Sequence, residues 1–170
     1  MRHLIRTGDR LMLLAVLTIS DRCSDGLLTD TAGPAVVVLL KRTWPQAEIR
    51  TALLRDDEDA IAAALKELSR QGVALALTVG GTGLSPRDRT PEATRRVIDR
   101  EAPGLAEAMR AKGAERNPHA WLSRGVAGML GSMLIVNLPG SKRGAEESLE
   151  AILGLLRHAI EIAAGGQNHP

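Results

Sequence analysis

Apolar runs of strand length alternate along this chain with segments whose apolar residues recur at helical spacing. Strands are predicted over residues 12–20, 48–54 and 73–79, and two short apolar runs over 126–130 and 133–138 complete the sheet. Helices are predicted over 33–42, between Asp56 or Asp57 as cap and Gly72, over 90–100, from 103 to before Asn117, and over 144–163. This alternation is typical of an α/β protein with a mostly parallel sheet covered on both faces.

Capping and turn residues set the expected ends of several elements. Thr90 is predicted to be the N-cap of its helix, with Pro91 at the first helical position, where a missing N–H costs nothing. The segment Ser20-Asp21-Arg22 is expected to form an ordinary turn after the first strand. Ser141 is expected to be an imperfect N-cap of the last helix.

The pattern predicts a single domain over residues 12–166, preceded by a loose extension over residues 1–11. The apolar run 11–19 follows three arginines, which raises the possibility of a signal peptide. It leads into Ser20-Asp21-Arg22 rather than into a small-residue cleavage site, and it is too short to span a bilayer, which needs ~20 apolar residues. We therefore expect a buried strand there.

Composition narrows the function classes. Lys and Arg number 22 against 20 Asp and Glu, and no basic stretch is interleaved with aromatic residues, so neither nucleic acid nor a membrane is an expected partner. The single cysteine, Cys23, cannot form an internal disulfide, which is typical of a reducing cytoplasm. With no Phe or Tyr, the core must consist of Leu, Val, Ile and Ala.

A glycine-rich loop, Thr78-Val79-Gly80-Gly81-Thr82-Gly83, follows the most apolar predicted strand. In open α/β sheets, ligands bind at this carboxyl edge, and glycines let successive N–H groups approach phosphate oxygens. The loop matches neither the Walker pattern nor the dinucleotide-binding fingerprint. It is interpreted as a phosphate or ligand loop, with a glycine-rich turn of no further purpose as the alternative.

Carboxylates and a second glycine stand at the other predicted strand ends. Asp56 begins the run Asp56-Asp57-Glu58-Asp59, Asp88 precedes a predicted helix, and Leu138-Pro139-Gly140-Ser141 precedes the last one. Each could be an ordinary helix cap or turn. If the strands are parallel, however, all of them share one edge with Asp21 and the glycine loop, and this combination suits Mg²⁺ and phosphates.

These residues resemble the MogA/MoaB-like molybdopterin-binding domains. The resemblance covers residues 12 to about 164, and its motifs appear in the family's order. They are Thr18-Ile19-Ser20-Asp21, Asp30-Thr31-Ala32-Gly33-Pro34, Arg55-Asp56-Asp57, Gly80-Gly81-Thr82-Gly83, Pro86-Arg87-Asp88-Arg89-Thr90-Pro91-Glu92-Ala93, Ser123-Arg124-Gly125 and Leu138-Pro139-Gly140-Ser141.

The resemblance implies a three-layer α/β/α fold, a homotrimer, and transfer of an adenylyl group from Mg-ATP to the terminal phosphate of molybdopterin, with release of pyrophosphate. It also implies that Asp56 and Asp88 are the essential carboxylates. Because a phosphate nucleophile is already ionised, we expect these two to organise Mg²⁺ rather than to remove a proton. The family's substrate-binding residues fall on Ser20, Asp21, Gly80, Gly81, Thr82, Gly83, Ser85, Ser123, Arg124, Pro139, Gly140 and Ser141. The chain departs from the family at Arg55, where Pro is frequent, and at Lys142, where Pro often follows the Leu-Pro-Gly-Ser motif.

Two other functions stay open on the sequence. One is a non-catalytic protein that binds molybdopterin or scaffolds other proteins of molybdenum-cofactor synthesis. The other is a nucleotide hydrolase of the competence-damage-associated type, which the compact chain disfavours. Asp56 and Asp88 favour chemistry over binding alone, because carboxylates repel phosphates unless a cation lies between them.

Overall fold

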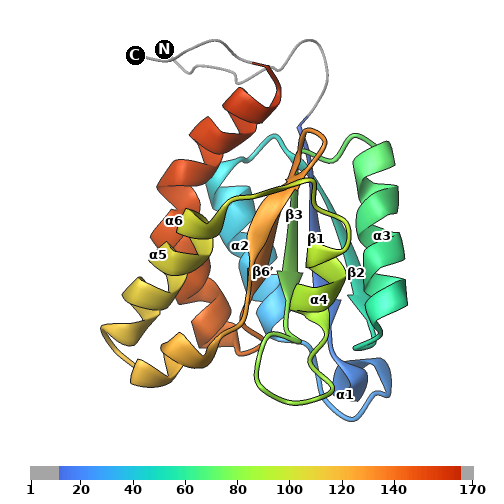
Figure 1. The fold of residues 1–170 in the computed structure, drawn as a ribbon, viewed down its shortest axis with the longest axis vertical. Coiled ribbons are helices and arrows are strands. Elements are labelled where there is room, and N and C mark those ends of the chain that lie inside the picture. The colour runs from blue at the N-terminus through green and yellow to red at the C-terminus, as the bar shows by residue number, and fades with distance from the viewer. Residues whose placement is uncertain (1–11, 166–170) are drawn as a thin grey trace.

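The computed structural model describes residues 12–165, so the extension predicted over 1–11 and the domain end predicted at 166 lie outside the described residues. A six-stranded sheet runs in the order β2-β1-β3-β6-β5-β4, with helices on both faces (Figure 1). The predicted three-layer α/β/α fold with a mostly parallel sheet is confirmed. The strands are β1 (Leu13–Ile19), β2 (Glu48–Leu54), β3 (Leu75–Val79), β4 (Arg100–Glu101), β5 (Ala127–Leu130) and β6 (Met133–Leu138).

Two sets of helices cover the sheet. Helices α3 and α4 pack on one face, and α2, α5 and α6 on the other (Figure 1). None of the helices described in residues 12–165 is both long and apolar enough to cross a membrane. The helices are α1 (Asp21–Ser24), α2 (Ala32–Thr43), α3 (Glu58–Arg70), α4 (Thr90–Arg95), α5 (Pro103–Ala114), the 3₁₀ helix η1 (Pro118–Leu122) and α6 (Lys142–Ala163).

The side chains of each strand point alternately to the two faces of the sheet, and this divides the core into two layers. In β1, Leu14 and Val16 pack toward α2 and α6, whereas Ala15 and Leu17 pack toward α3. Successive side chains of a strand point to opposite faces, so a strand that is buried on both sides must be apolar at nearly every position. This explains why β1, β3 and β6 appear in the sequence as continuous apolar runs.

The four parallel strands β2, β1, β3 and β6 end together. In the register of the sheet, Ile19 pairs with Leu54, while Val79 pairs with both Thr18 and Leu138. The loops that follow these strands therefore leave the sheet at one edge, as the sequence predicts for parallel strands. Strands β5 and β6 instead form an antiparallel hairpin, because the two residues between them, which begin with Gly131 at φ +59°, allow only a tight turn.

Three local predictions were wrong. Thr90 is the first residue of α4 rather than its N-cap, because its buried hydroxyl donates to the Gly80 carbonyl oxygen (2.9 Å) instead of capping the helix. Helix α4 ends at Arg95, not Arg100, because the chain turns there to add Arg100 and Glu101 to the sheet as β4. The turn expected at Ser20-Asp21-Arg22 is the start of α1, where Ser20 accepts a hydrogen bond from the Cys23 N–H (3.2 Å).

A buried polar side chain, Asn137 on β6, links the sheet to α4. Its amide donates to the hydroxyls of Thr78 and Thr94, both at 2.9 Å, and its oxygen accepts from the Val126 N–H at 3.1 Å. Asn137 is only 1% exposed, so water cannot replace these partners. The network fixes α4, which holds the glycine loop through Thr90, against the two strands beneath it.

Asn137→Ala is expected to lower the free energy of unfolding by about 2–4 kcal/mol, because it removes these bonds and leaves the buried hydroxyls of Thr78 and Thr94 without their partner. Urea unfolding followed by circular dichroism measures this value. Asn117→Ala is the matched control, since Asn117 is exposed and caps only η1, and it should cost about 1 kcal/mol or less. Equal losses in the two variants would contradict the role assigned to Asn137.

Candidate functional site

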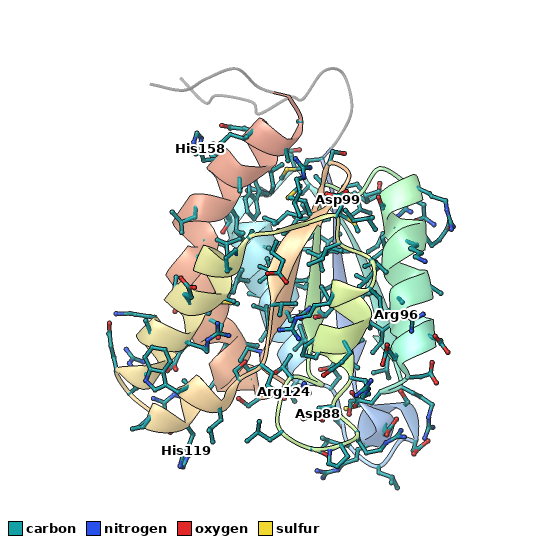
Figure 2. All side chains as sticks on the ribbon, viewed as in Figure 1. Asp88, Arg96, Asp99, His119, Arg124 and His158 are labelled. Atoms are coloured by element: carbon teal, nitrogen blue, oxygen red, sulfur yellow. The ribbon has the colours of Figure 1, made fainter. Side chains whose placement is uncertain are left out.

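A cavity of about 1010 Å³ opens at the edge where the parallel strands end. Its walls are the loops after β1, β3 and β6, the start of α2, and the segment from α5 through η1. Figure 2 shows Asp88, Arg124 and His119 at this end of the molecule, opposite Asp99 and His158. The predicted site residues that line the cavity are Ser20, Asp56, Gly80, Gly81, Thr82, Gly83, Asp88, Ser123, Pro139, Gly140 and Ser141.

Three predicted site residues, Asp21, Ser85 and Arg124, lie beside the cavity rather than among the residues that line it. Asp21 forms ion pairs with Arg87 and Arg55. Ser85 accepts a hydrogen bond from the Arg87 N–H within its own loop (3.3 Å). Arg124 binds main-chain carbonyls and Glu92. All three therefore contact the chain itself at this edge.

The glycine loop approaches the rest of the site too closely for any other residue. Gly80 and Gly81 have φ of +107° and +64°, which L side chains rarely adopt. A Cβ on Gly80 would overlap the Ile19 carbonyl oxygen, and one on Gly81 would overlap the Asp56 carboxylate. The loop backbone thus lies directly against Asp56, so the predicted ligand loop and the acidic strand end form one site.

Asp56 is a partly buried carboxylate with an unsatisfied oxygen. Among the described residues, its buried Oδ1 has no hydrogen-bond partner. Burial, followed by the negative charges of Asp88 and Asp21, raises the pKa of Asp56 to about 6. A charge buried in this way costs free energy unless a cation or a donor from outside the chain compensates it.

Asp88 closes the loop in which it lies. Its Oδ2 accepts the Gly83 N–H at 2.8 Å, and its own N–H donates to the Ser85 carbonyl at 3.0 Å. The alternative of Asp88 as a helix cap was wrong, because the carboxylate faces back to Gly83 and Arg89 occupies the N-cap position of α4. Asp88 and Asp56 line the same cavity, and the negative charge of Asp88 acts on the pKa of Asp56.

Asp21 supports Asp56 from the rim of the site. Its Oδ1 accepts the Asp56 N–H at 3.1 Å, and its Oδ2 accepts from the Arg87 guanidinium at 2.5 and 3.1 Å. The hydrogen bond from Arg87 is the main cause of the lowered pKa of Asp21. Asp21 therefore stays ionised and holds the backbone of β2's end in place.

The cavity is also lined by basic side chains, most of which sequence reasoning missed. They are Arg110, Arg116, His119 and Arg143. Arg116 and Arg143 share Glu147, at 3.1 and 2.9 Å. Only Arg143 carried a signal in the sequence, as a cation next to a predicted binding loop. The other side chains lie on the segment from α5 to η1, whose approach to the site depends on tertiary packing.

Asp30 belongs to one of the family motifs but was not predicted to be a site residue. It lines the cavity, and its carboxylate accepts from the Thr18 hydroxyl (2.6 Å) and from the Ala32 and Gly33 N–H groups (3.1 and 2.9 Å). The last two bonds cap α2. Asp30 is therefore satisfied by the chain, unlike Asp56.

The carboxylates supply only some of the ligands that a hard cation such as Mg²⁺ requires. Residues 12–165 contain no cluster of three or more His, Cys, Asp or Glu side chains arranged to bind a metal ion. Asp56 and Asp88 nevertheless supply two carboxylates to one cavity. Mg²⁺ is commonly held by one or two carboxylates together with substrate phosphates and water, and this donor set fits that pattern.

Comparison with known proteins gives the family. The family described as "Probable molybdopterin binding domain" matches residues 15–158, so the chain belongs to it. Among solved structures, the molybdopterin biosynthesis enzyme MoaB from Thermus thermophilus is similar, with a TM-score of 0.84 and 47% identity over 91% of this chain and 98% of that chain. The resemblance on which the sequence analysis relied is therefore confirmed.

The curated relatives differ in how much of their length this chain covers. The molybdopterin adenylyltransferase of Haemophilus influenzae is 39% identical over 144 residues, which are 84% of this chain and 73% of that protein. The molybdenum cofactor synthesis protein cinnamon of Drosophila melanogaster is 38% identical over 86% of this chain. The chain spans 25% of cinnamon's length and less than half of two other curated relatives that it matches.

Asp56→Asn is expected to raise the melting temperature at pH 8 but not at pH 4.5. The pKa of Asp56 is about 6 in the folded protein and 3.8 in the unfolded chain, so the folded state binds this proton more tightly. The resulting stabilisation is fully present below pH 3.8 and is lost as the pH rises through 6. The full shift equals at most about 3 kcal/mol. Because Asp56 is partly exposed, the expected gain in the free energy of unfolding at pH 8 is about 1 kcal/mol, which corresponds to a rise in melting temperature of roughly 2–4 °C.

Thermal unfolding in a metal chelator measures this difference. Asp57→Asn is the matched control at pH 8, because Asp57 caps α3 by accepting the Ala60 N–H (2.7 Å) and Asn caps a helix equally well. A gain from Asp56→Asn that is the same at both pH values would show that the buried charge is not its cause.

Proposed function

We propose that this chain transfers the adenylyl group of Mg-ATP to the terminal phosphate of molybdopterin, giving adenylyl-molybdopterin and pyrophosphate. One observation carries the proposal: Asp56 and Asp88 line a single cavity with the glycine loop, and a buried oxygen of Asp56 has no partner among the described residues. Membership of the molybdopterin-binding family supports the pterin substrate, and the name of the Haemophilus influenzae relative supports the reaction.

Asp56 and Asp88 fit the role of holding Mg²⁺. Their charges repel each other, which contributes to the raised pKa of Asp56, and a divalent cation would relieve both this repulsion and the missing hydrogen bond. When bound there, Mg²⁺ would supply neutralisation of the phosphate charge and of the departing pyrophosphate. The chain supplies too few ligands to enclose the ion, so the phosphates would complete its coordination.

In this reaction, a terminal phosphate oxygen of molybdopterin attacks the α-phosphorus of ATP. A new phosphorus–oxygen bond forms, and the bond from the α-phosphorus to the bridging oxygen of pyrophosphate breaks. The attacking phosphate is already ionised near neutral pH, so no side chain has to remove a proton. The residues of the site position the two ligands and balance their charge, which is where catalysis of phosphoryl-type transfer chiefly arises.

The shape and charge of the cavity support two anionic ligands. Its volume of about 1010 Å³ is at the upper end for small-molecule pockets, which are usually about 300–1,000 Å³. The carboxylates, the glycine loop, Arg116 and Arg143 all line it. We assign the loop N–H groups of Gly81 and Thr82 to phosphate or the pterin edge, and the arginines to the remaining negative charge.

The proposal includes an assembly and a location. We propose a homotrimer in the cytoplasm, as the family resemblance implies, which receives molybdopterin from other proteins of molybdenum-cofactor synthesis.

Incubation of the protein with molybdopterin and Mg-ATP, scored for pyrophosphate and adenylylated pterin, tests the reaction. Tight pterin binding without either product would instead identify a non-catalytic binding or scaffold protein. ATP hydrolysis without a pterin acceptor would identify a hydrolase.

Asp88→Ala is expected to lower kcat about a hundredfold or more, corresponding to ~3 kcal/mol, because one of the two carboxylates that organise the phosphates is lost. The assay is pyrophosphate release under saturating substrates, with circular dichroism to establish that the variant is folded. Asp59→Ala is the control, since its side chain is 86% exposed and pairs with Arg96. It should turn over within about twofold of the unaltered protein. Normal turnover by Asp88→Ala would remove Asp88 from the mechanism.

A further inference from the structure

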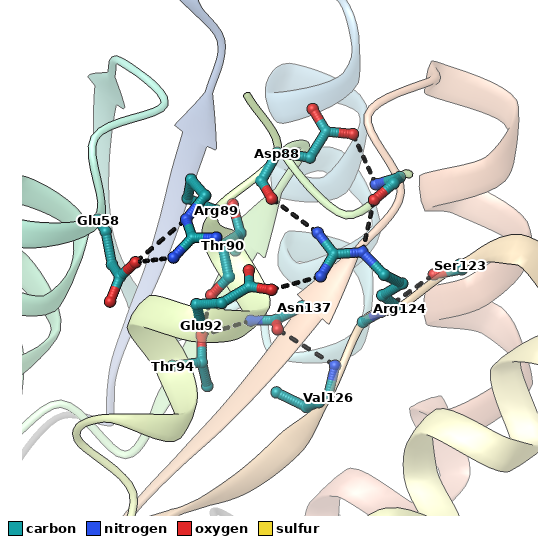
Figure 3. Close-up of polar contacts among 12 residues, drawn as sticks. Glu58, Asp88, Arg89, Thr90, Glu92, Thr94, Ser123, Arg124, Val126 and Asn137 are labelled. Carbon is teal, nitrogen blue, oxygen red and sulfur yellow. Dashed lines mark hydrogen bonds and ion pairs between the residues drawn. The ribbon is translucent and has the colours of Figure 1, made fainter. Parts of the chain in front are cut away.

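Arg124 lies behind the site loop and binds it at both ends. Its Nε donates to the Gly83 carbonyl oxygen at 2.7 Å, and its terminal NH2 group donates to the Asp88 carbonyl oxygen at 2.7 Å (Figure 3). The other terminal nitrogen pairs with the Glu92 carboxylate in the first turn of α4. One guanidinium thus joins three points that no strand or helix connects.

The backbone of the same residue adds a fourth contact. The Arg124 N–H donates to the Thr82 carbonyl oxygen at 2.9 Å. Residues 82–88 are consequently attached to the segment that precedes β5 by both the main chain and the side chain of Arg124. Inside this loop, the Gly83 N–H binds the Asp88 carboxylate, so the position of that carboxylate depends on where Gly83 and Asp88 are held.

The side chain of Arg124 takes no part in lining the cavity proposed for the substrates. It is absent from the residues lining the cavity, whereas its neighbours Ser123 and Gly125 line it. It contributes instead to the wall of a second, smaller hollow, together with Arg95 and Arg110. The family resemblance places Arg124 in a substrate-binding loop, but each of its three guanidinium nitrogens already donates to an acceptor of the protein.

We propose that Arg124 is a positioning residue, which holds the Gly83–Asp88 loop closed so that the Asp88 carboxylate faces the cavity, and that it does not bind substrate. The effect on turnover rests on the proposed function, whereas the effect on the loop does not. Three acceptors in different directions require the planar fork of a guanidinium. A lysine ammonium keeps the charge but cannot reach Gly83, Asp88 and Glu92 together.

The test compares Arg124→Lys and Arg124→Ala with the unaltered full-length chain. Hydrogen exchange of the Gly83 amide, followed by NMR, reports directly on the bond to Asp88. We expect at least a tenfold faster exchange at Gly83 in both variants, while exchange at Thr78 in β3 keeps its rate, because the loop opens without global unfolding. Unchanged exchange at Gly83, or equal acceleration at Thr78, would overturn the proposal.

Kinetics distinguish positioning from substrate binding. Both variants should lose about tenfold to a hundredfold in kcat, while KM for molybdopterin and for ATP stays within about threefold. Added guanidinium ion should restore part of the kcat of Arg124→Ala but not of Arg124→Lys, in which the ammonium occupies the space. A rise in KM with kcat unchanged would make Arg124 a substrate ligand and overturn the proposal.

Arg100→Lys is the matched control. Arg100 also donates to a main-chain carbonyl, that of Gly131 at 2.9 Å, but it lies on β4 away from the cavity. This variant should leave Gly83 exchange and both kinetic constants unchanged. If the unaltered protein makes no adenylyl-molybdopterin, the proposed function fails, and the exchange measurements still decide whether Arg124 positions the loop.

Discussion

The carboxylate of Asp56, held against the glycine backbone with one oxygen unsatisfied, is the constraint on which the site depends. A partly buried carboxylate whose Oδ1 has no partner among the described residues is unfavourable, and the nearby charges of Asp88 and Asp21 increase that cost. The fold can hold Asp56 there because it follows β2, whose end is fixed by pairing with β1 and by the bond from the Asp56 N–H to Asp21. The rest of the protein therefore stabilises an arrangement that, above the pKa of Asp56, a bound cation or donor would satisfy.

The glycine loop stays close to Asp56 because a chain of buried hydroxyls holds it. Gly80 is bound by the Thr90 hydroxyl, the Thr90 carbonyl by the Thr94 hydroxyl, and Thr94 by Asn137 in the sheet. Each group in this chain is almost completely buried, so each bond is strong relative to water and would be costly to leave unmade. Arg124 secures the other side of the same loop, which leaves the loop little freedom between its two supports.

Sequence periodicity predicted the layers and the edge at which the site forms, because both follow from local rules. Parallel strands must end on one side, so Asp56, Gly80 and Gly140 had to lie near one another once the sheet order was right. The rules failed where tertiary contacts override them. Thr90 was expected to cap a helix but donates to Gly80. Arg110 and Arg116 were missed because nothing local indicates which face of α5 and η1 turns toward a cavity.

For the same reason, sequence alone could not show which carboxylate at this edge is left free to bind a ligand. Asp30 caps α2, Asp57 caps α3 and Asp21 is paired with Arg87, so the chain itself satisfies each of them. Asp56 differs from them only in its neighbours, since the same side chain one residue later in the chain is an ordinary cap. A carboxylate that the protein leaves unsatisfied is available to a ligand, and one that it satisfies contributes to stability. The division between function and folding at this edge therefore lies in hydrogen-bond partners, which depend on the three-dimensional arrangement of loops far apart in the sequence.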